Sequence, residues 1–195
     1  MGRSYQSLEQ PHIDFLQAQP VFFVATAPLS GDGHINCSPK GGDSLRLLDA
    51  NTVAYLDLPG SGVETIAHLQ ENRRIVLMAC AFNGAPRICR LHGHGEVITP
   101  LDGGFSQLYA RFSAAPAVRA IILIHVSRVS DSCGYGVPLM EFSAARKDSA
   151  EYVARSSDQA LRDYVRRENA LSIDGLPGLA GANAKSIIIN RTKPA

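Results

Sequence analysis

The 195-residue sequence has no Trp, few Lys (four, beside fifteen Arg) and no apolar run near the length of a membrane-spanning helix. Its first residues are polar, so the sequence predicts no secretory signal, and we expect a cytoplasmic protein. Neither sign of charge dominates, since 19 basic residues face 18 acidic ones. This balance argues against a general affinity for nucleic acid or for an anionic membrane.

Several motifs of known active sites are also missing. The patterns GxGxxG, GxxxxGK[ST], GxSxG and HExxH do not occur, so the usual dinucleotide, P-loop, hydrolase and zinc-protease sites are unsupported. The four cysteines are scattered without a CxxC pair, which predicts reduced thiols. His92 and His94 are two residues apart, but no third ligand has a recognisable spacing, so no metal site is expected.

Short apolar segments separated by tight turns fill the first 130 residues. The turns contain Gly, Pro, Asn or Asp, and their shortness implies antiparallel pairing. The expected strands span 20–27, 34–38, 44–48, 52–58, 74–82, 87–98 and 119–129, and the expected helices span 63–71 and 102–112. We therefore predict a mainly β fold with short helices, in which about six antiparallel strands close into a small barrel without exposed edges.

The pattern changes after residue 129. A Gly-rich loop over 130–138 is followed by a charged helical stretch over 148–170 and by a tail with several Gly and Pro residues. The sequence thus predicts two parts, a barrel domain over 1–140 and a helical C-terminal extension over 141–195 that packs on the barrel.

Two segments could hold an anion. The first is HINCSPKGGDSLR (34–46), where cationic and hydroxyl side chains flank glycines whose backbone N–H groups a phosphate could approach; the alternative is an exposed strand connection. The second is LDLPGSGVET (56–65), which ends at the N-terminus of an expected helix. Here the alternative is a capped helix, with Ser61 as N-cap and Glu64 at the third helical position.

Two further segments carry weaker signals. In RICRLHGHGEV (87–97), the polar residues Arg90, His92, His94 and Glu96 share one strand face, and the two intervening glycines mark a bulge or a close approach of other atoms. In SCGYG (132–136), a Tyr ring and a thiol between glycines could line a flat aromatic ligand, or simply form a loop.

Four stretches, in this order, are similar to one known family. They are VFFVATAPLSGDGHINCSPKG, NTVAYLDLPGSGVETIAHLQENRRIVLMACAF, PRICRLHGHGEVI and SDSCGYGVPLMEF. Over about residues 18–130 this order resembles the pyridoxamine 5′-phosphate oxidase-like, FMN-binding split-barrel family. The resemblance implies a six-stranded split barrel, a homodimer with FMN at the subunit interface, and flavin-dependent oxidation or reduction of an unknown small molecule.

The resemblance also implies which residues contact the cofactor. Ser61, Glu64 and Thr65 match the segment that holds the FMN phosphate, and Cys133 and Tyr135 would come from the partner or from a closing loop. The complete set is Ser38, Lys40, Gly41, Arg46, Asp57, Leu58, Ser61, Glu64, Thr65, Arg90, Cys133 and Tyr135. No catalytic side chain is expected, because the flavin carries the chemistry.

Two departures from the family pattern matter. Pyridoxamine 5′-phosphate oxidases have an Arg-Lys pair where this chain has Glu64 and Thr65, and a carboxylate repels a phosphate. Either FMN binds more weakly, or Lys40, Arg46 or Arg90 supplies the missing charge. The C-terminal substrate signature of those oxidases is absent as well, so pyridoxamine phosphate is not carried over as the substrate.

Two other functions stay open at this point. The loss of the cationic pair at Glu64 and Thr65 is compatible with a non-catalytic flavin-binding or sensor protein. The same barrel could instead hold deazaflavin F420 or haem, for which His92, His94 or His125 would be available as an axial ligand.

Overall fold

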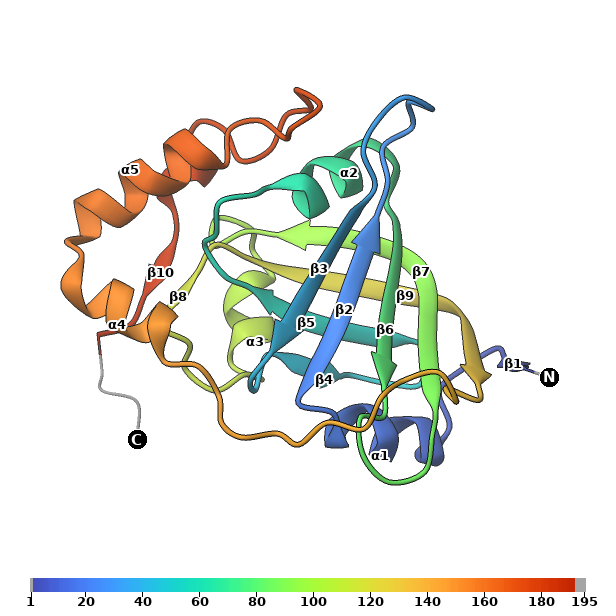
Figure 1. The fold of residues 1–195 in the computed structure, drawn as a ribbon. Coiled ribbons are helices and arrows are strands. Elements are labelled where there is room, and N and C mark those ends of the chain that lie inside the picture. Colours follow the sequence, from blue (N-terminus) through green and yellow to red (C-terminus); the bar gives the residue numbers. More distant parts are fainter. Residues whose placement is uncertain (1, 192–195) are drawn as a thin grey trace.

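The computed structural model describes residues 2–191, and its main feature is one antiparallel sheet of eight strands (Figure 1). Seven of them are hydrogen-bonded in the order β3-β2-β6-β7-β9-β5-β4, and β1 pairs with β9. The strands are β1 (Arg3–Tyr5), β2 (Val21–Thr26), β3 (Asn36–Gly41), β4 (Leu45–Leu47), β5 (Thr52–Asp57), β6 (Arg74–Cys80), β7 (Ile88–Ile98) and β9 (Ala120–Ser132). The mainly β, antiparallel split-barrel fold expected from the sequence is confirmed.

The strands alternate between the core and the outside, as period-two side chains must. In β2, Phe22, Val24 and Thr26 are buried, and the residues between them are partly exposed. The interior is filled by large apolar side chains such as Leu77 and Leu91, which are fully buried. One side of the sheet therefore forms the core of the barrel, and the other side remains on the surface.

The barrel is split between its two end strands. β3 and β4 follow each other along the chain, yet they lie at opposite ends of the strand order. The three-residue link from Gly42 to Ser44 carries the chain from one edge to the other, and Leu56 of β5 donates its backbone N–H to the carbonyl of Ser44. The edge of β3 thus comes close to the end of β5, although no ladder joins these two strands.

Five α-helices flank the sheet in the part of the chain that the structure describes. In Figure 1, α2 covers the upper end of the barrel and α1 the lower end, while α4 and α5 form a separate layer at one side. The helices are α1 (Gln10–Ala18), α2 (Glu64–Asn72), α3 (Phe105–Tyr109), α4 (Asp148–Arg155) and α5 (Asp158–Glu168). Among the residues from 2 to 191, no helix is both long and apolar enough to span a membrane.

Several expected details are wrong. Ser61 does not cap α2, because the helix begins after Val63, which offers no side-chain hydrogen bond. The helix expected over 102–112 is limited to α3. The charged stretch over 148–170 is two helices, since the Ser157 side chain accepts a hydrogen bond from Ala160 N and starts α5.

Three short strands and two helices were not predicted from the sequence. They are β1, the pair β8 (Ala117–Val118) and β10 (Ile188–Ile189), the helix α1 and the 3₁₀ helix η1 (Asn183–Lys185). The division into a barrel over 1–140 and an extension over 141–195 stays a prediction, and its last four residues lie outside the described part.

The two glycines of β7 have the role that the sequence predicted. The ladder between β7 and β9 shifts register between His92 and Gly93, which is a β-bulge. A Cβ atom at Gly93 would clash with the backbone carbonyl of His125, and one at Gly95 would lie 2.8 Å from the side chain of Leu69 in α2. Glycine is therefore required at position 93, where the backbone of β9 approaches β7, whereas a methyl group at position 95 would displace the end of the Leu69 side chain.

We predict that Gly93→Ala lowers the free energy of unfolding by about 3 kcal/mol, because backbone atoms of β9 must move to admit the methyl group. The matched control is Gly103→Ala, where the new methyl group meets no atom within 4 Å, and a change within about 0.5 kcal/mol is expected. Urea unfolding of both variants measures the difference. If Gly93→Ala and Gly103→Ala had the same free energy of unfolding, the close approach of β9 to Gly93 would be contradicted.

Candidate functional site

A polar cluster lies where the edge of β3 faces the end of β5. Alternation along β3 turns Asn36, Ser38 and Lys40 to the same, half-buried side of the strand. The Lys40 ammonium lies 3.2 Å from a carboxylate oxygen of Asp57, the last residue of β5. This ion pair bridges the split of the barrel, because β3 and β5 are not neighbours in the sheet.

Asp57 is fully buried and has a second cationic partner. Arg119, itself almost completely buried, donates from Nε to the other carboxylate oxygen at 2.7 Å. Burial raises the pKa of Asp57, but the attraction of Arg119 and Lys40 outweighs it and holds the pKa below its ordinary value. The carboxylate is therefore ionised at neutral pH.

Arg119 also fixes the loop that joins β5 to α2. Its Nη1 atom donates to the carbonyl of Gly62 and to the side-chain oxygen of Asn169, each at 2.7 Å. Asn169, buried at the end of α5, donates in turn to the carbonyl of Gly60 at 2.8 Å. Three hydrogen bonds from two side chains, Arg119 and Asn169, thus fasten the Gly60–Gly62 loop against the barrel.

Neutral donors and acceptors surround Lys40. Asn36 donates to the hydroxyl of Thr65 in α2 at 2.9 Å, and Ser38 donates to the side-chain oxygen of Asn36 at 3.3 Å. The ring of Tyr55 lies below Lys40, with Nζ 5.8 Å from the ring centre. Among the described residues, the buried Tyr55 hydroxyl has no hydrogen-bond partner, which is unusual for a buried polar atom.

The N-terminus of α2 borders this cluster. Ser61 is exposed, and no side chain caps the helix. Glu64, the first helical residue, turns back toward Gly62, and its Oε1 accepts a hydrogen bond from the backbone N–H of Ile173 at 3.3 Å. Glu64 occupies a position where the family pattern has a basic residue, and its carboxylate is thus hydrogen-bonded to the C-terminal segment.

The structure therefore brings Ser38, Lys40, Asp57 and Thr65 together from the residues that the sequence predicted. Gly41 ends β3 and accepts a hydrogen bond from the Ser44 side chain at 2.7 Å. These residues border one polar region, with one cation, several hydroxyl groups and a helix N-terminus. Such a set can hold a ligand that carries an anionic group and hydroxyl groups.

Two predicted residues near the cluster have other contacts. Arg46 of β4 donates to the Asp43 carboxylate at 2.7 Å, and its guanidinium lies 5.0 Å from the ring centre of Phe112. Leu58 packs with the second, smaller apolar cluster of the protein, which includes Phe105 of α3. Arg46 is thus already paired with a carboxylate.

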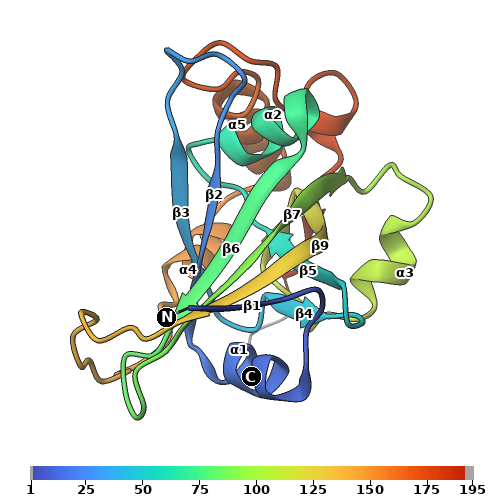
Figure 2. The ribbon, with the colours of Figure 1, turned by 90° about the vertical axis from the view of Figure 1, so that its right-hand side faces the viewer.

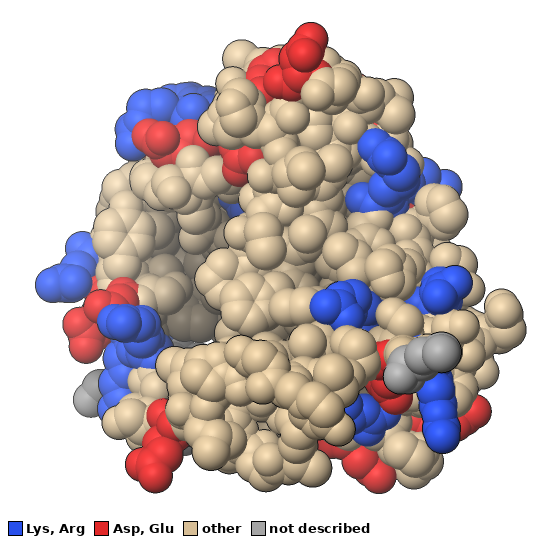
Figure 3. Space-filling view, turned by 45° about the vertical axis from the view of Figure 1, so that its right-hand side comes forward, with Lys and Arg blue, Asp and Glu red and all other residues tan. Residues whose placement is uncertain are grey.

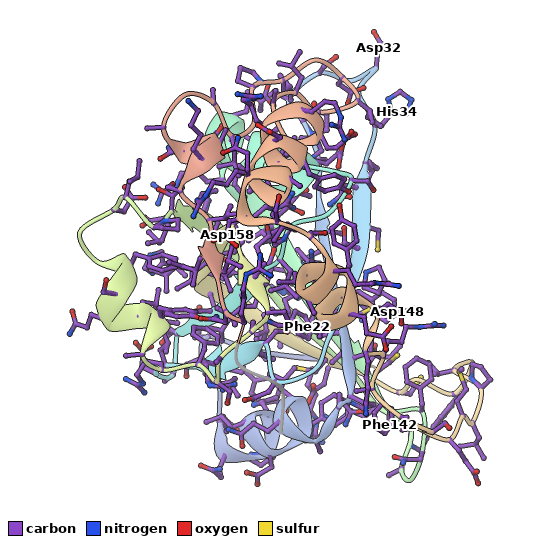
Figure 4. The ribbon with its side chains drawn as sticks, turned by 90° about the vertical axis from the view of Figure 1, so that its left-hand side faces the viewer. Phe22, Asp32, His34, Phe142, Asp148 and Asp158 are labelled. Atoms are coloured by element: carbon purple, nitrogen blue, oxygen red, sulfur yellow. The ribbon has the colours of Figure 1, made fainter. Side chains whose placement is uncertain are left out.

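The remaining predicted residues lie at the other end of the sheet. Arg90 of β7 donates to the Ser132 side chain at 2.9 Å, and Tyr135 is 82% exposed. Cys133 is exposed too, and like the three other cysteines it is free. The segment that follows β9 projects from the molecule together with the β6–β7 turn (Figure 2), and Phe142 lies on it (Figure 4). Within the described chain, these residues do not join the Lys40 cluster.

Sequence reasoning missed four members of the cluster: Asn36, Tyr55, Arg119 and Asn169. A faint signal exists for Arg119, a cation directly before the apolar run over 120–124. The other residues have no local signal, because their roles depend on partners far away in the sequence.

Metal binding has no support in the described residues, where no group of three or more His, Cys, Asp or Glu side chains could hold an ion. His94 and His125 are register partners on β7 and β9, and His125 lies 3.7 Å from Glu96.

Comparisons with known proteins give one clear relative. No family model matches the chain. The chain is 38% identical over 197 residues to the pyridoxamine 5′-phosphate oxidase family protein ustO of Aspergillus flavus, an alignment that covers 91% of this chain and 78% of that protein.

Solved structures share the fold. A putative pyridoxamine 5′-phosphate oxidase from Lactobacillus delbrueckii is 18% identical, with a TM-score of 0.50, over 64% of this chain and 94% of that one. A variant of HupZ from Group A Streptococcus is 23% identical, with a TM-score of 0.50, over 64% of this chain and 98% of that one.

The paired charges at Asp57 give a stability prediction. We expect Asp57→Asn to lower the free energy of unfolding by about 3–5 kcal/mol, because Arg119 and Lys40 lose a buried counter-charge. The control is Asp163→Asn, whose partner Arg166 is exposed, with an expected change below about 1 kcal/mol. Urea unfolding at neutral pH measures both changes.

The same variants test the pH dependence. Because folding lowers the pKa of Asp57, its contribution is complete above the unfolded pKa and is lost as the pH falls toward the folded one. The stability of the natural protein should therefore fall more steeply on acidification than that of Asp57→Asn. If the free energies of unfolding of the two proteins fell in parallel as the pH was lowered, the lowered pKa of Asp57 would be contradicted.

Proposed function

Because the chain belongs to the pyridoxamine 5′-phosphate oxidase family, we propose that it binds FMN at the split of its barrel and acts as an FMN-dependent oxidoreductase on a small molecule. The observation that carries this proposal is the polar cluster at the edge of β3. When bound, FMN supplies the hydride and electron transfer, and the protein holds and orients it.

Lys40 is the residue best suited to the FMN phosphate. Its ammonium has three N–H donors, one of which meets Asp57, so two donors are left for a phosphate. Its side chain is 21% exposed, so a ligand can reach it. Lys40, Arg119 and Asp57 together carry a net charge of +1, which the carboxylate of Glu64 at the start of α2 offsets. The attraction for an anion therefore depends on Lys40 and on the hydrogen bond that turns Glu64 toward Ile173.

The neutral groups fit the rest of a flavin nucleotide tail. Ser38, Ser61 and Thr65 offer hydroxyl groups for the ribityl chain and the phosphate, and the uncapped N-terminus of α2 offers backbone N–H donors. The unpartnered hydroxyl of Tyr55 lies within the same cluster. Glu64 is the one unfavourable group, and its hydrogen bond to Ile173 N directs it to the C-terminal segment.

We further propose that the protein is a homodimer. The outer face of β2 and β6 carries Phe23, Ala25, Val76 and Met78, all partly exposed. No helix lies in front of this face in Figure 1, and most of its surface is uncharged in Figure 3. A depression of about 410 Å³ on it is lined by residues that include His92. An uncovered apolar sheet face of this kind supports a second copy as its partner.

Flavin binding is tested with Lys40→Met. We expect the variant to bind FMN about tenfold to a hundredfold more weakly, because one charge-assisted hydrogen bond is lost. Its affinity for riboflavin, which lacks the phosphate, should stay within about twofold of the natural protein, since no phosphate contact is involved. Quenching of flavin fluorescence measures both affinities.

Lys147→Met is the matched control, because Lys147 is exposed and lies outside the cluster, and it should leave both affinities unchanged. Natural protein that binds neither flavin would refute the proposal. An absorption spectrum of the purified protein separates FMN from F420 and haem. Reduction of the bound flavin by NADH or NADPH, with reoxidation in air, separates an oxidoreductase from a flavin-binding sensor.

The homodimer is tested with Val76→Glu. Size-exclusion chromatography with light scattering should give twice the mass of the chain for the natural protein and a single-chain mass for the variant, since a charge is costly in a buried apolar interface. Leu101→Glu, at a side chain that is 58% exposed elsewhere, should remain a dimer. If the natural protein is a stable monomer, the proposed dimer through the outer face of β2 and β6 is contradicted.

A further inference from the structure

A cavity distinct from the Lys40 cluster and from the depression on β2 and β6 lies between the barrel and the C-terminal helices. Its volume is about 350 Å³, a size typical of small-molecule sites. Pro59 and Ala117 form the barrel side, and α4 and α5 form the other side. The surface in Figure 3 is visibly hollowed beside the part of the molecule that carries these helices.

The inner part of the cavity is apolar, and its two helices are tied together by hydrogen bonds. Val153 of α4 and Leu161 of α5 are buried there, and Ala117 is buried on the opposite side. The two helices are held at their junction by Arg191, which donates to the carbonyl of Ser156 at 2.7 Å and pairs with Asp158. The cavity is therefore built into the fold and does not depend on a flexible loop.

Two tyrosines form its aromatic wall. Tyr152 of α4 and Tyr164 of α5 meet edge to face, with ring centres 6.1 Å apart. Tyr152 is 47% exposed, so part of its ring is available to a ligand. Arg167 lies over the Tyr164 ring, but it pairs with Glu168 and does not line the cavity. A flat ring would find both aromatic partners and an apolar floor here.

The charge of the lining residues favours a cationic ligand over an anionic one. Asp148, in the first turn of α4, is the one charged residue among those that line the cavity, and it is exposed beside Ser149 (Figure 4). Among residues 2–191, no Lys or Arg belongs to the lining. An anionic ligand would thus meet a carboxylate without compensation, while a cationic group would be attracted by Asp148 and by the tyrosine rings.

We propose that this cavity binds an aromatic amine, with its ring against Tyr152, Val153 and Leu161 and its ammonium group toward Asp148. The cavity shares Pro59 with the loop that follows β5, so the amine would lie beside the proposed flavin site. Its role as the small molecule that this protein acts on rests on the proposed function, but the binding itself does not require a flavin.

The absence of Trp from the chain makes a direct test possible. Indole probes can be excited where tyrosine does not absorb, so their fluorescence anisotropy reports binding without protein background. The probes are tryptamine, neutral 3-methylindole and anionic indole-3-propionate. We expect tryptamine to bind saturably and roughly tenfold more tightly than indole-3-propionate, with 3-methylindole between them.

Two variants test where the ammonium group and the indole ring of the bound probe lie. Asp148→Asn should weaken tryptamine about three- to fivefold and leave 3-methylindole unchanged, because one exposed charge contact is lost. Glu151→Gln, a carboxylate on the same helix that does not line the cavity, should change neither. Tyr152→Ala should weaken both probes.

Two results would overturn the proposal: no saturable binding of tryptamine, or equal effects of Asp148→Asn and Glu151→Gln. Failure here is distinct from failure of the flavin site, because Asp148→Asn should leave the FMN affinity unchanged. A protein that binds tryptamine as expected but no flavin would refute the proposed function alone.

Discussion

The buried carboxylate of Asp57 is the group that the rest of the structure is arranged around. A lone ionised carboxylate inside a barrel would be strongly destabilising, so the fold has to bring cations to it. Lys40 comes from one edge of the split, and Arg119 comes from the start of β9. Arg119 also reaches the Gly62 carbonyl and Asn169, which joins the barrel, the β5–α2 loop and the end of α5 in a single network. The residues that neutralise the Asp57 carboxylate therefore also position the candidate cofactor site and the C-terminal helices.

Much of the barrel could be predicted because its signals are local. The alternation in β2, the Gly- and Pro-rich turns and the glycines of β7 depend on neighbouring residues, and the predicted strands are present. The candidate site could be predicted only in part. Lys40 was found from the cationic segment over 34–46 and Asp57 through the resemblance to a family, but their pairing was not foreseen. Arg119 lies 62 residues from Asp57, and Asn169 lies a further 50 residues away, so no local pattern records these contacts.

Glu64 and Thr65 replace the Arg-Lys pair of the oxidases, which raises the question of which other cation could bind a phosphate here. The positions of the cations in the structure narrow the choice. Three residues could have replaced the cationic pair of the oxidases. Arg46 is paired with Asp43, and Arg90 bonds Ser132 at the other end of the sheet. Lys40 alone borders the polar cluster, and Asp57 keeps it there. An anion at this edge would thus depend on one lysine whose position is set by a buried acid, rather than on a pair of basic residues.

The long-range contacts of the C-terminal segment also bear on how the protein is made. His34, at the tip of the β2–β3 turn, is bonded through its backbone and its ring to Asp174, 140 residues later. At a synthesis rate of about 5–20 residues per second, roughly 7–28 seconds pass between the synthesis of these two partners. During that interval the Gly60–Gly62 loop lacks Asn169, and Arg119 lacks one of its acceptors. The ribosome-bound chain would therefore carry a barrel whose β5–α2 loop is not yet fixed, and the emergence of α5 and Asn169 would complete the network around it.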